Sequence, residues 1–270
     1  MAEYDFDGRV AFVTGGARGQ GRSHALRYAE NGADVACADI CETTDESAYE
    51  LGDETELDET VRKVEDRGQS ALGVQMDVAD EREVEAGVER AVSEFGRIDF
   101  LANNAGVAPV SGLMELDEQT WDHALDVNLK GRWLCAKHVG QHMIDRGEGG
   151  RIVNTPSTAG MVASPGLGHY TAAKHGVLGL TKTLAMELAP HDVTVNAVCP
   201  TAVDTPTTGG IVESIGEEMA EVAEQSGPDN VLGEIVQPED VSAAFVWLSS
   251  DDARFVTGIA LPVAAGATAI

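Results

Sequence analysis

Short apolar runs alternate with helix-like segments along the whole chain, and this alternation restricts the possible folds more than any other feature. Apolar runs predict strands over 9–14, 34–39, 72–78, 98–102, 151–154, 193–199 and 259–263. Between them, apolar residues at helical spacing predict helices over 22–30, 61–67, 81–95, 121–145, 170–188 and 241–249. Strands that are apolar throughout indicate a parallel sheet covered on both faces. With right-handed crossovers, the prediction is an α/β, Rossmann-type doubly wound sheet of about seven strands.

The domain organisation follows from the length and from two unusual stretches. The 270 residues suffice for one core and contain no linker or repeat, so we expect a single domain over 1–270. Residues 42–60 hold nine acids; a solvated loop is the default interpretation, and a flap over the adenosine end of a cofactor is the alternative. Residues 202–235 are expected to form the substrate lid. Its apolar members, which indicate an apolar part of the substrate, are Val203, Ile211, Val212, Ile215 and Met219.

The charge of the chain limits its partners and its environment. With 46 acids and 18 bases the net charge is −28, which repels nucleic acid and anionic membranes. Self-repulsion of this size destabilises a compact chain unless salt screens it, so we predict adaptation to concentrated salt, with a merely acidic cytosolic protein as the alternative. No apolar run reaches the roughly 20 residues of a membrane span. The acidic residues 1–8 do not resemble a signal peptide, so a cytoplasmic location is expected.

A glycine-rich turn, TGGARGQG at 14–21, follows the first expected strand. Gly15, Gly19 and Gly21 allow a tight turn and a close approach of the backbone to a pyrophosphate, which the next helix would face with its N-terminus. A plain glycine-rich turn is the alternative, but the strand before it and the helix after it favour a dinucleotide site.

Asp39 ends the second expected strand and bears on the choice of cofactor. A carboxylate there can accept hydrogen bonds from the adenosine ribose and repels a 2′-phosphate, which favours NAD over NADP. Arg18, in the glycine loop, could instead pair with that phosphate. We expect NAD, because contact between like charges in a partly buried pocket is costly.

Tyr170 and Lys174 lie four residues apart on an expected helix, so the ammonium can lie beneath the phenol. A free phenol has a pKa of about 10, which a nearby cation and the positive nicotinamide would lower. This pair alone is common, and a surface tyrosine over a lysine is the alternative. Its context is more specific, because Ser157 precedes the pair and Asn128 lies inside the expected helix 121–145.

Taken together, these residues resemble the short-chain dehydrogenase/reductase family. The matching motifs are TGxxxGxG at 14–21, NNAG at 103–106, Asn128, Ser157 and the YxxxK pair, in order through nearly the whole chain. The resemblance implies that Tyr170 is the general acid–base, that Ser157 hydrogen-bonds the substrate oxygen, and that Lys174 holds the nicotinamide ribose and lowers the pKa of Tyr170. It also implies that Asn128 fixes a water that relays protons to Lys174, and that the long helices pack a homotetramer.

Several further residues are expected to line the cofactor, many of them on the strength of the resemblance. They are Gly15, Ala17, Arg18, Gly19, Gln20, Gly21, Asp39, Ile40, Asp77, Val78, Asn104, Ala105, Gly106, Val127, Tyr170, Lys174, Pro200, Val203 and Thr205. Two residues depart from the wider family: Pro156 stands where a second serine is frequent, and Thr201 replaces a glycine.

Finer stretches are similar to the carveol-dehydrogenase-like, mycofactocin-associated branch of the family. They include residues 19–25, 39–41, 168–170, 173–176 and 200–206, and the branch also has extra residues after the second strand, matching 42–60. This resemblance implies an enzyme that holds NAD too tightly to exchange and passes electrons to another carrier.

No metal site is expected. His138 and His142 lie four residues apart on a helix, but no third ligand is evident and HExxH is absent. His169 and His175 flank the tyrosine–lysine pair; either could contact substrate or pack, and packing is favoured for His175. Cysteines 37 and 41 are interpreted as small buried residues rather than redox groups.

The sequence therefore predicts an NAD-dependent dehydrogenase that acts on a secondary alcohol, or on the matching ketone in reverse. An NADPH-preferring ketone reductase is the alternative enzyme. A redox sensor that binds the cofactor without turnover is the alternative from another class, and the presence of Ser157, Tyr170 and Lys174 together argues against it.

Overall fold

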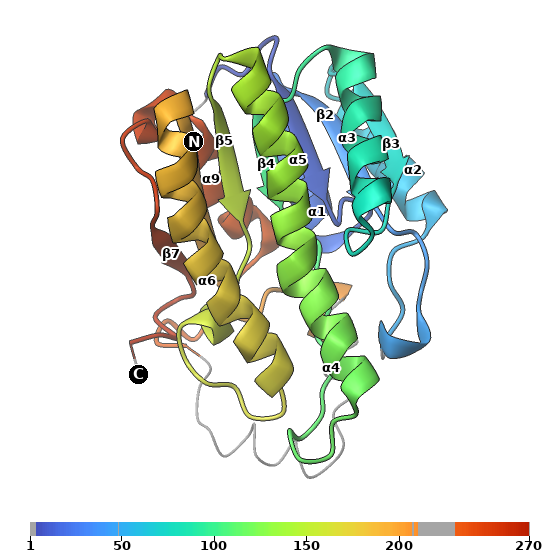
Figure 1. Ribbon diagram of the computed structural model, residues 1–270, viewed down its shortest axis with the longest axis vertical. Coiled ribbons are helices and arrows are strands. Elements are labelled where there is room, and N and C mark those ends of the chain that lie inside the picture. The colour runs from blue at the N-terminus through green and yellow to red at the C-terminus, as the bar shows by residue number, and fades with distance from the viewer. Residues whose placement is uncertain (1–3, 48, 207, 210–229, 270) are drawn as a thin grey trace.

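The computed structural model describes residues 4–47, 49–206, 208–209 and 230–269. Seven parallel strands form one sheet in the order β3-β2-β1-β4-β5-β6-β7 (Figure 1). The strands are β1 (Val10–Thr14), β2 (Asp34–Asp39), β3 (Ala71–Gln75), β4 (Phe100–Asn103), β5 (Gly150–Asn154), β6 (Val193–Pro200) and β7 (Ala260–Val263). The predicted doubly wound parallel sheet is confirmed.

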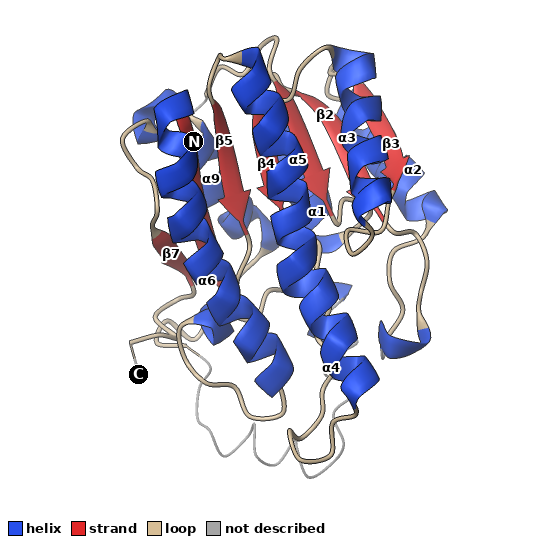
Figure 2. Ribbon diagram, in the orientation of Figure 1, coloured by secondary structure: helices blue, strands red, loops and turns tan. Residues whose placement is uncertain are grey.

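Helices cover both faces of the sheet, as Figure 2 shows. They are α1 (Gly19–Ala29), α2 (Glu54–Glu65), α3 (Glu81–Phe95), α4 (Glu118–Leu125), α5 (Gly131–Arg146), α6 (Gly168–Leu188) and α9 (Pro238–Ser249). Alternation along β1 explains the two apolar cores: Ala11 and Val13 pack on the side of α1 and α9, whereas Phe12 packs on the side of α3 and α5.

The strand order reverses between β1 and β4, because β1 pairs with β2 on one side and with β4 on the other. In open α/β sheets, ligands bind beyond the carboxyl ends of the strands at such a reversal. The chain segments that follow β1, β4 and β5 therefore converge where a ligand site is expected.

The acidic segment 42–60 differs from the default expectation. A 3-10 turn covers Asp45–Ser47, and α2 begins at Glu54, seven residues before the predicted start of the helix. Asp53 accepts a hydrogen bond from the Glu56 N–H (2.8 Å), and Glu56 accepts one in return from the Asp53 N–H (3.3 Å). This capping box stabilises the helix start, so the loop interpretation was wrong for 54–60.

The predicted long helix 121–145 consists of α4, a π-helical turn (Asp126–Lys130) and α5. It begins earlier than predicted because Asp117 caps it, accepting a hydrogen bond from the Thr120 N–H at 2.8 Å. Single π-turns inside α-helices are frequent at functional sites. This one contains Asn128.

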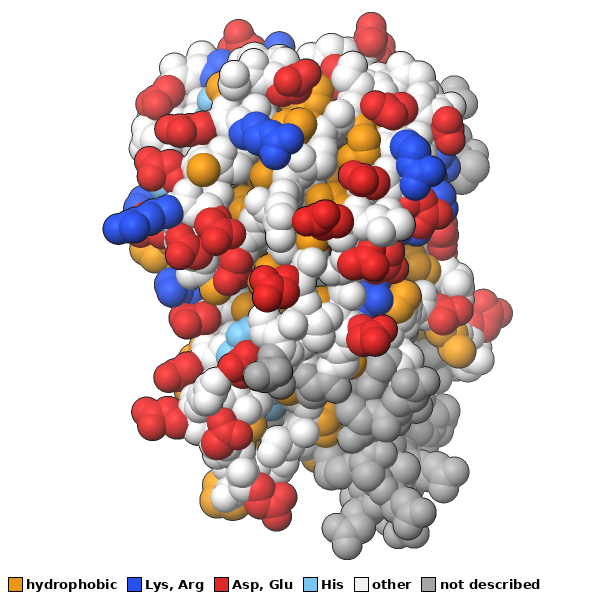
Figure 3. Space-filling model, turned by 90° about the vertical axis from the view of Figure 1, so that its right-hand side faces the viewer, with side chains coloured by type: hydrophobic (Ala, Val, Ile, Leu, Met, Phe, Trp, Pro, Cys, Tyr) orange, Lys and Arg blue, Asp and Glu red, His pale blue; other side chains and the backbone are white. Residues whose placement is uncertain are grey.

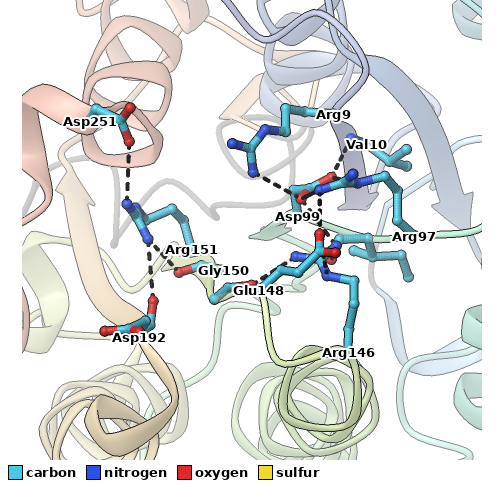
Figure 4. Close-up of polar contacts among 12 residues, drawn as sticks. Arg9, Val10, Arg97, Asp99, Arg146, Glu148, Gly150, Arg151, Asp192 and Asp251 are labelled. Carbon is cyan, nitrogen blue, oxygen red and sulfur yellow. Dashed lines mark hydrogen bonds and ion pairs between the residues drawn. The ribbon is translucent and has the colours of Figure 1, made fainter.

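At the opposite, amino-terminal edge of the sheet, three arginines surround the buried carboxylate of Asp99 (Figure 4). Arg97 donates two hydrogen bonds to it (2.8 and 2.6 Å), and Arg146 and Arg9 lie at 3.0 and 3.3 Å. The Val10 N–H also donates to it at 2.9 Å. Asp99 thus joins the starts of β1 and β4 to the end of α5, far from the carboxyl edge.

Acidic side chains are spread over the face shown in Figure 3, with few lysines and arginines between them. Among the described residues, no helix combines the length and the apolar character needed to cross a bilayer.

Candidate active site

Thr14, at the end of β1, fastens the glycine loop to the NNAG segment. Its buried hydroxyl oxygen accepts hydrogen bonds from the N–H groups of Asn104 (2.9 Å) and Ala105 (3.0 Å). The Asn104 side-chain amide donates to the Thr14 carbonyl at 3.1 Å. The two loops on either side of the strand reversal are therefore held in a fixed relation.

The glycine loop satisfies the steric demands of a pyrophosphate site. Gly15 and Gly19 have φ values of +68° and +57°, and a Cβ on Gly21 would lie 1.9 Å from the Gly15 carbonyl oxygen. No side chain in the described part of the chain caps the start of α1, and its first turn contains no acid. Free N–H groups and the positive end of the helix dipole suit an anion, so the loop fits the diphosphate of a dinucleotide.

Asp39 lies beside this loop, and its carboxylate accepts a hydrogen bond from the Ala17 N–H at 2.9 Å. Burial raises its pKa, an effect that bonds from backbone N–H groups and the charge of Arg18 oppose. Arg18 itself pairs with Glu56 (3.7 Å) and donates to the Glu50 carbonyl. Arg18, the basic residue of the glycine loop, is thus already bound to groups of the chain that follows β2.

The segment at residues 43–47 and 49–52, here called the strap, links three parts of the carboxyl edge. The Tyr49 hydroxyl oxygen accepts a hydrogen bond from the Ala108 N–H (2.9 Å), beyond β4. The Gln119 amide, on α4, donates to the Glu46 carboxylate. Together with the bond from Arg18 to Glu50, these contacts carry the strap from the glycine loop to the segment after β4, on both sides of the strand reversal.

Ser157, Tyr170 and Lys174 come together beyond the carboxyl ends of β5 and β6. The Lys174 ammonium lies 4.9 Å from the centre of the Tyr170 ring and donates to the Thr155 carbonyl at 3.1 Å. The Ser157 hydroxyl lowers the pKa of Tyr170 and donates to the Pro200 carbonyl at 3.3 Å. Ser157 precedes a 3-10 turn, Thr158–Gly160, that it caps through the Ala159 N–H (3.1 Å).

The electrostatics of this pair differ from the sequence-based expectation. Burial raises the pKa of Tyr170 above its usual value, although the Ser157 hydroxyl and the charge of Arg132 lower it. Burial also lowers the pKa of Lys174 well below its usual value, and Arg132 lowers it further. In the chain by itself, the predicted depression of the Tyr170 pKa by Lys174 is therefore not found, because burial dominates.

Asn128 lies in the π-turn, fully buried against the NNAG loop. Its side-chain amide donates to the carbonyls of Val107 (2.7 Å) and Ala124 (2.9 Å). Its Oδ1 has no hydrogen-bond partner among the described residues, and a Cβ on Gly106 would lie 2.6 Å from it. The amide thus fixes the turn to the loop after β4.

The remaining predicted cofactor residues surround the same edge. Asp77 accepts a hydrogen bond from the Ala79 N–H (2.8 Å), and Val78 and Val127 are buried nearby. Thr205 lies against Gly19, where a Cβ would meet its side chain at 3.5 Å. Four predicted residues have not yet been placed. Gln20 has a buried Oε1 with no partner among the described residues, and Ile40 follows β2 and accepts a hydrogen bond from the Gln75 amide at 3.2 Å. Pro200 is buried at the end of β6, and Val203 is buried just beyond it. Residues 207 and 210–229 of the predicted lid lie outside the described residues.

Several polar residues that the sequence singled out have structural partners. His142 accepts a hydrogen bond from the Ile98 N–H (3.1 Å), and His138 faces Glu81 at 3.5 Å. Within the part of the chain that the structure describes, no cluster of His, Cys, Asp or Glu could hold a metal ion. His169 is buried, but His175 is exposed and hydrogen-bonds to the Thr171 carbonyl (2.9 Å), so packing was wrong for His175.

The two cysteines around Asp39 are unsuited to redox chemistry at neutral pH. Cys37 is buried, and burial raises its thiol pKa to about 12. Cys41 is half-buried, and burial together with nearby carboxylates raises its thiol pKa to about 12 as well. Neither thiol forms the reactive thiolate readily.

Comparison with known proteins identifies the family. A family model described as "Enoyl-(Acyl carrier protein) reductase" matches residues 15–268. A (−)-trans-carveol dehydrogenase of Rhodococcus erythropolis is 42% identical over 275 residues, covering 97% of this chain and 98% of that protein. This chain belongs to the short-chain dehydrogenase/reductase family. The predicted resemblance is confirmed, and the carveol dehydrogenase agrees with the predicted branch.

Two further relatives extend the comparison. The crystal structure of a carveol dehydrogenase from Mycobacterium avium in complex with NAD superposes with a TM-score of 0.91 at 38% identity, covering 98% of this chain and 99% of that one. A cis-4-hydroxycyclohexanecarboxylate dehydrogenase of Sinomonas cyclohexanicum is 40% identical, covering 98% of both chains.

Proposed function

We propose that this oxidoreductase transfers a hydride between a secondary alcohol, or the matching ketone, and NAD, with Tyr170 as the acid–base. The observation that carries the proposal is the convergence of Ser157, Tyr170 and Lys174 beyond β5, beside a glycine loop that fits a dinucleotide. A redox sensor that binds the cofactor without turnover would not require these three side chains together. Relatives named for carveol and for a hydroxycyclohexane acid favour an alcohol carried on a ring.

Each side chain of the site has a separate role in the proposed reaction. When bound, NAD supplies the carbon that accepts the hydride. In alcohol oxidation, Ser157 donates a hydrogen bond to the substrate oxygen, and the Tyr170 phenolate takes the hydroxyl proton as the C–H bond breaks. In ketone reduction, Tyr170 returns that proton to the oxygen. Lys174 holds the nicotinamide ribose from its position on the Thr155 carbonyl, and Asn128 fixes a water that relays protons to Lys174.

NAD is favoured over NADP by the partners of Arg18. This guanidinium, the one feature that supported NADPH, is already held by Glu56 and the Glu50 carbonyl. The Asp39 carboxylate beside it is placed to accept hydrogen bonds from ribose hydroxyls and to repel a 2′-phosphate. The NADPH-preferring reductase therefore remains the alternative to the proposed function.

The experiment that tests the proposed function offers the purified chain NAD or NADP in concentrated salt with ring-borne and open-chain secondary alcohols. Formation of reduced nicotinamide is followed by absorbance, and an artificial electron acceptor is added in parallel in case NAD stays bound. We expect turnover with NAD and a preference over NADP of more than about tenfold, since one unfavourable charge contact costs on the order of 1.4 kcal/mol. A chain that binds NAD and oxidises no alcohol in either assay is a sensor.

The strap is proposed to slow the release of NAD, because its contacts connect the two sides of the strand reversal where the dinucleotide would bind. Combining Tyr49→Phe with Gln119→Ala removes two hydrogen bonds, each worth about 1 kcal/mol. We expect NAD to dissociate about 30-fold faster from this variant in competition measurements, since the two bonds together contribute about 2 kcal/mol. Arg67→Ala, which removes an exposed ion pair to Glu30 (3.2 Å) and touches none of the strap contacts, serves as the control. Equal dissociation rates in all three proteins would disprove the role of the strap.

The other sequence-based expectations are retained as parts of this proposal. The chain forms a single domain over 1–270, and residues 202–235 act as the substrate lid. It works in the cytoplasm at high salt, which screens its net charge of −28. It assembles as a homotetramer through the long helices.

A further inference from the structure

A buried arginine, Arg132, lies one helical turn after Asn128. Its side chain is 1% exposed, and its guanidinium donates to three backbone carbonyls. These are the carbonyls of Asn128 (2.8 Å), Thr155 (2.9 Å) and Asn104 (3.3 Å). They come from the π-turn, from the segment after β5 and from the NNAG loop, so the guanidinium is fixed at the centre of the candidate site.

No carboxylate among the described residues forms an ion pair with Arg132. The titratable groups that act on this part of the site are Tyr170 and Lys174 on α6, Cys135 on α5, Cys199 on β6 and Tyr49 in the strap. None of these groups is a carboxylate, and burial raises the pKa of each of the tyrosines and thiols among them, so none supplies a resident negative charge near pH 7. A buried cation without a counter-ion is costly, and the cost falls when an anion forms beside it.

Arg132 and Lys174 share one carbonyl. The Thr155 oxygen accepts from Arg132 Nη2 and from Lys174 Nζ. A Cβ on Gly106 would lie 3.2 Å from the first nitrogen and 3.5 Å from the second, so both cationic groups border the same point. Arg132 is therefore part of the surroundings of the tyrosine–lysine pair, although it contacts neither the phenol nor the solvent.

We propose that Arg132 is a positioning residue for the proposed dehydrogenation, a fixed positive charge behind Lys174 that stabilises the Tyr170 phenolate. The inference rests on the proposed function and deepens it. The family pattern gives this electrostatic role to the lysine alone. Here the guanidinium, which does not lose its proton near neutrality, carries a share of it.

The pKa shifts of Arg132, Lys174 and Tyr170 agree with a role for Arg132 as the permanent positive charge of the site. Burial lowers the pKa of Arg132, but only to about 10, so it stays charged at neutral pH. Burial and then the charge of Arg132 lower the pKa of Lys174, which weakens Lys174 as a cation. Burial raises the pKa of Tyr170, and Arg132 is one of the two groups that oppose this.

The test compares pH profiles of kcat/KM for alcohol oxidation in the full chain. Arg132→Met removes the charge and keeps a long side chain. We expect the apparent pKa of the basic group to rise by about one unit, which lowers activity about tenfold below that pKa and leaves it unchanged at high pH. Arg132→Lys retains a cation, so its apparent pKa should stay close to the wild-type value. If Arg132→Met does not fold, Arg132→Gln, which keeps a donor for the Asn128 carbonyl, gives the same measurement.

A purely structural role for Arg132 would lower the melting temperature of the neutral variants without moving the pH profile, and that result would overturn the inference. Tyr170→Phe, measured alongside, separates this failure from failure of the proposed function. An inactive Tyr170→Phe with an unmoved Arg132→Met profile rejects only the role of Arg132. A fully active Tyr170→Phe rejects the proposed function itself.

Discussion

Tyr170→Phe is expected to lower kcat/KM for alcohol oxidation by about 10²–10⁴-fold, the usual contribution of one acid–base group. The phenol ring would keep its place over Lys174, but no group would remain to take the hydroxyl proton. Because the base must be deprotonated and burial raises the Tyr170 pKa, oxidation by the wild-type chain should accelerate as pH rises towards that pKa. The variant should lose this acceleration.

NAD binding and a matched variant separate chemistry from folding. NAD affinity, measured by titration, should change by no more than a few-fold, about 1 kcal/mol, because the glycine loop and Asp39 are untouched. Tyr4→Phe removes another phenolic hydroxyl, on a ring that stacks on Phe6 (6.1 Å), away from the carboxyl edge, and should keep full activity. Retention of half the wild-type activity by Tyr170→Phe would assign the proton transfer to another group.

The sheet and the two loops beside β1 and β4 could be predicted because their signals are local. Apolar runs such as 9–14 and 34–39 give strands whatever their neighbours are, and they match β1 and β2 closely. Gly15 and Gly21 are constrained by their own turn. The positions of Ser157 and Tyr170 also follow from spacing, because Ser157 comes shortly after a strand and Tyr170 lies in the first turn of a helix.

The elements that were misjudged depend on contacts between segments or on balances of polar effects. The start of α2 depends on a capping box whose two acids look, in sequence, like any other pair within an acidic stretch. The π-turn at 126–130 has no repeat of its own and is fixed by the bond from Asn128 to Val107. Predicting the direction of the Tyr170 pKa shift would have required knowing that the side chain is buried, and no sequence motif gives that information.

Arg132 and Tyr49 were missed for the same reason. The partners of Tyr49 and Arg132, Ala108 and the Thr155 carbonyl respectively, are distant in sequence. Weak signals were nevertheless present: a lone aromatic residue among nine acids, and an arginine in a helix whose neighbours Leu134 and Cys135 are buried.

A second large effect is expected at the other edge of the sheet. Asp99→Ala should lower the free energy of unfolding by about 3 kcal/mol, since removal of one partner from a buried ion pair leaves charges without compensation. In the variant, Arg97 and Arg146 would remain close to each other without their shared carboxylate. The buried Val10 N–H would lose its acceptor. Denaturant unfolding in concentrated salt measures the difference.

Glu148→Ala is the matched control, because Glu148 contacts the same two arginines at 3.3 and 3.7 Å but is 58% exposed. Solvent and salt screen such a pair, so the control should lose less than about 1 kcal/mol. Equal losses in the two variants would mean that burial of Asp99 adds nothing to these ion pairs.

The pH dependence of the difference follows from the carboxyl pKa of Asp99. Burial raises that pKa, but the hydrogen bonds from Arg97 and Val10 and the charge of Arg146 outweigh burial, so the net pKa is below its usual value. A depressed folded-state pKa stabilises the fold above the unfolded-state pKa of about 3.9, and the stabilisation is lost as pH falls through the folded-state value. Wild type and Asp99→Ala should therefore differ most near neutrality and converge in acid. A gap that stays constant into acid would assign the loss to packing, and the arginine cluster would then be a consequence of the fold rather than one of its supports.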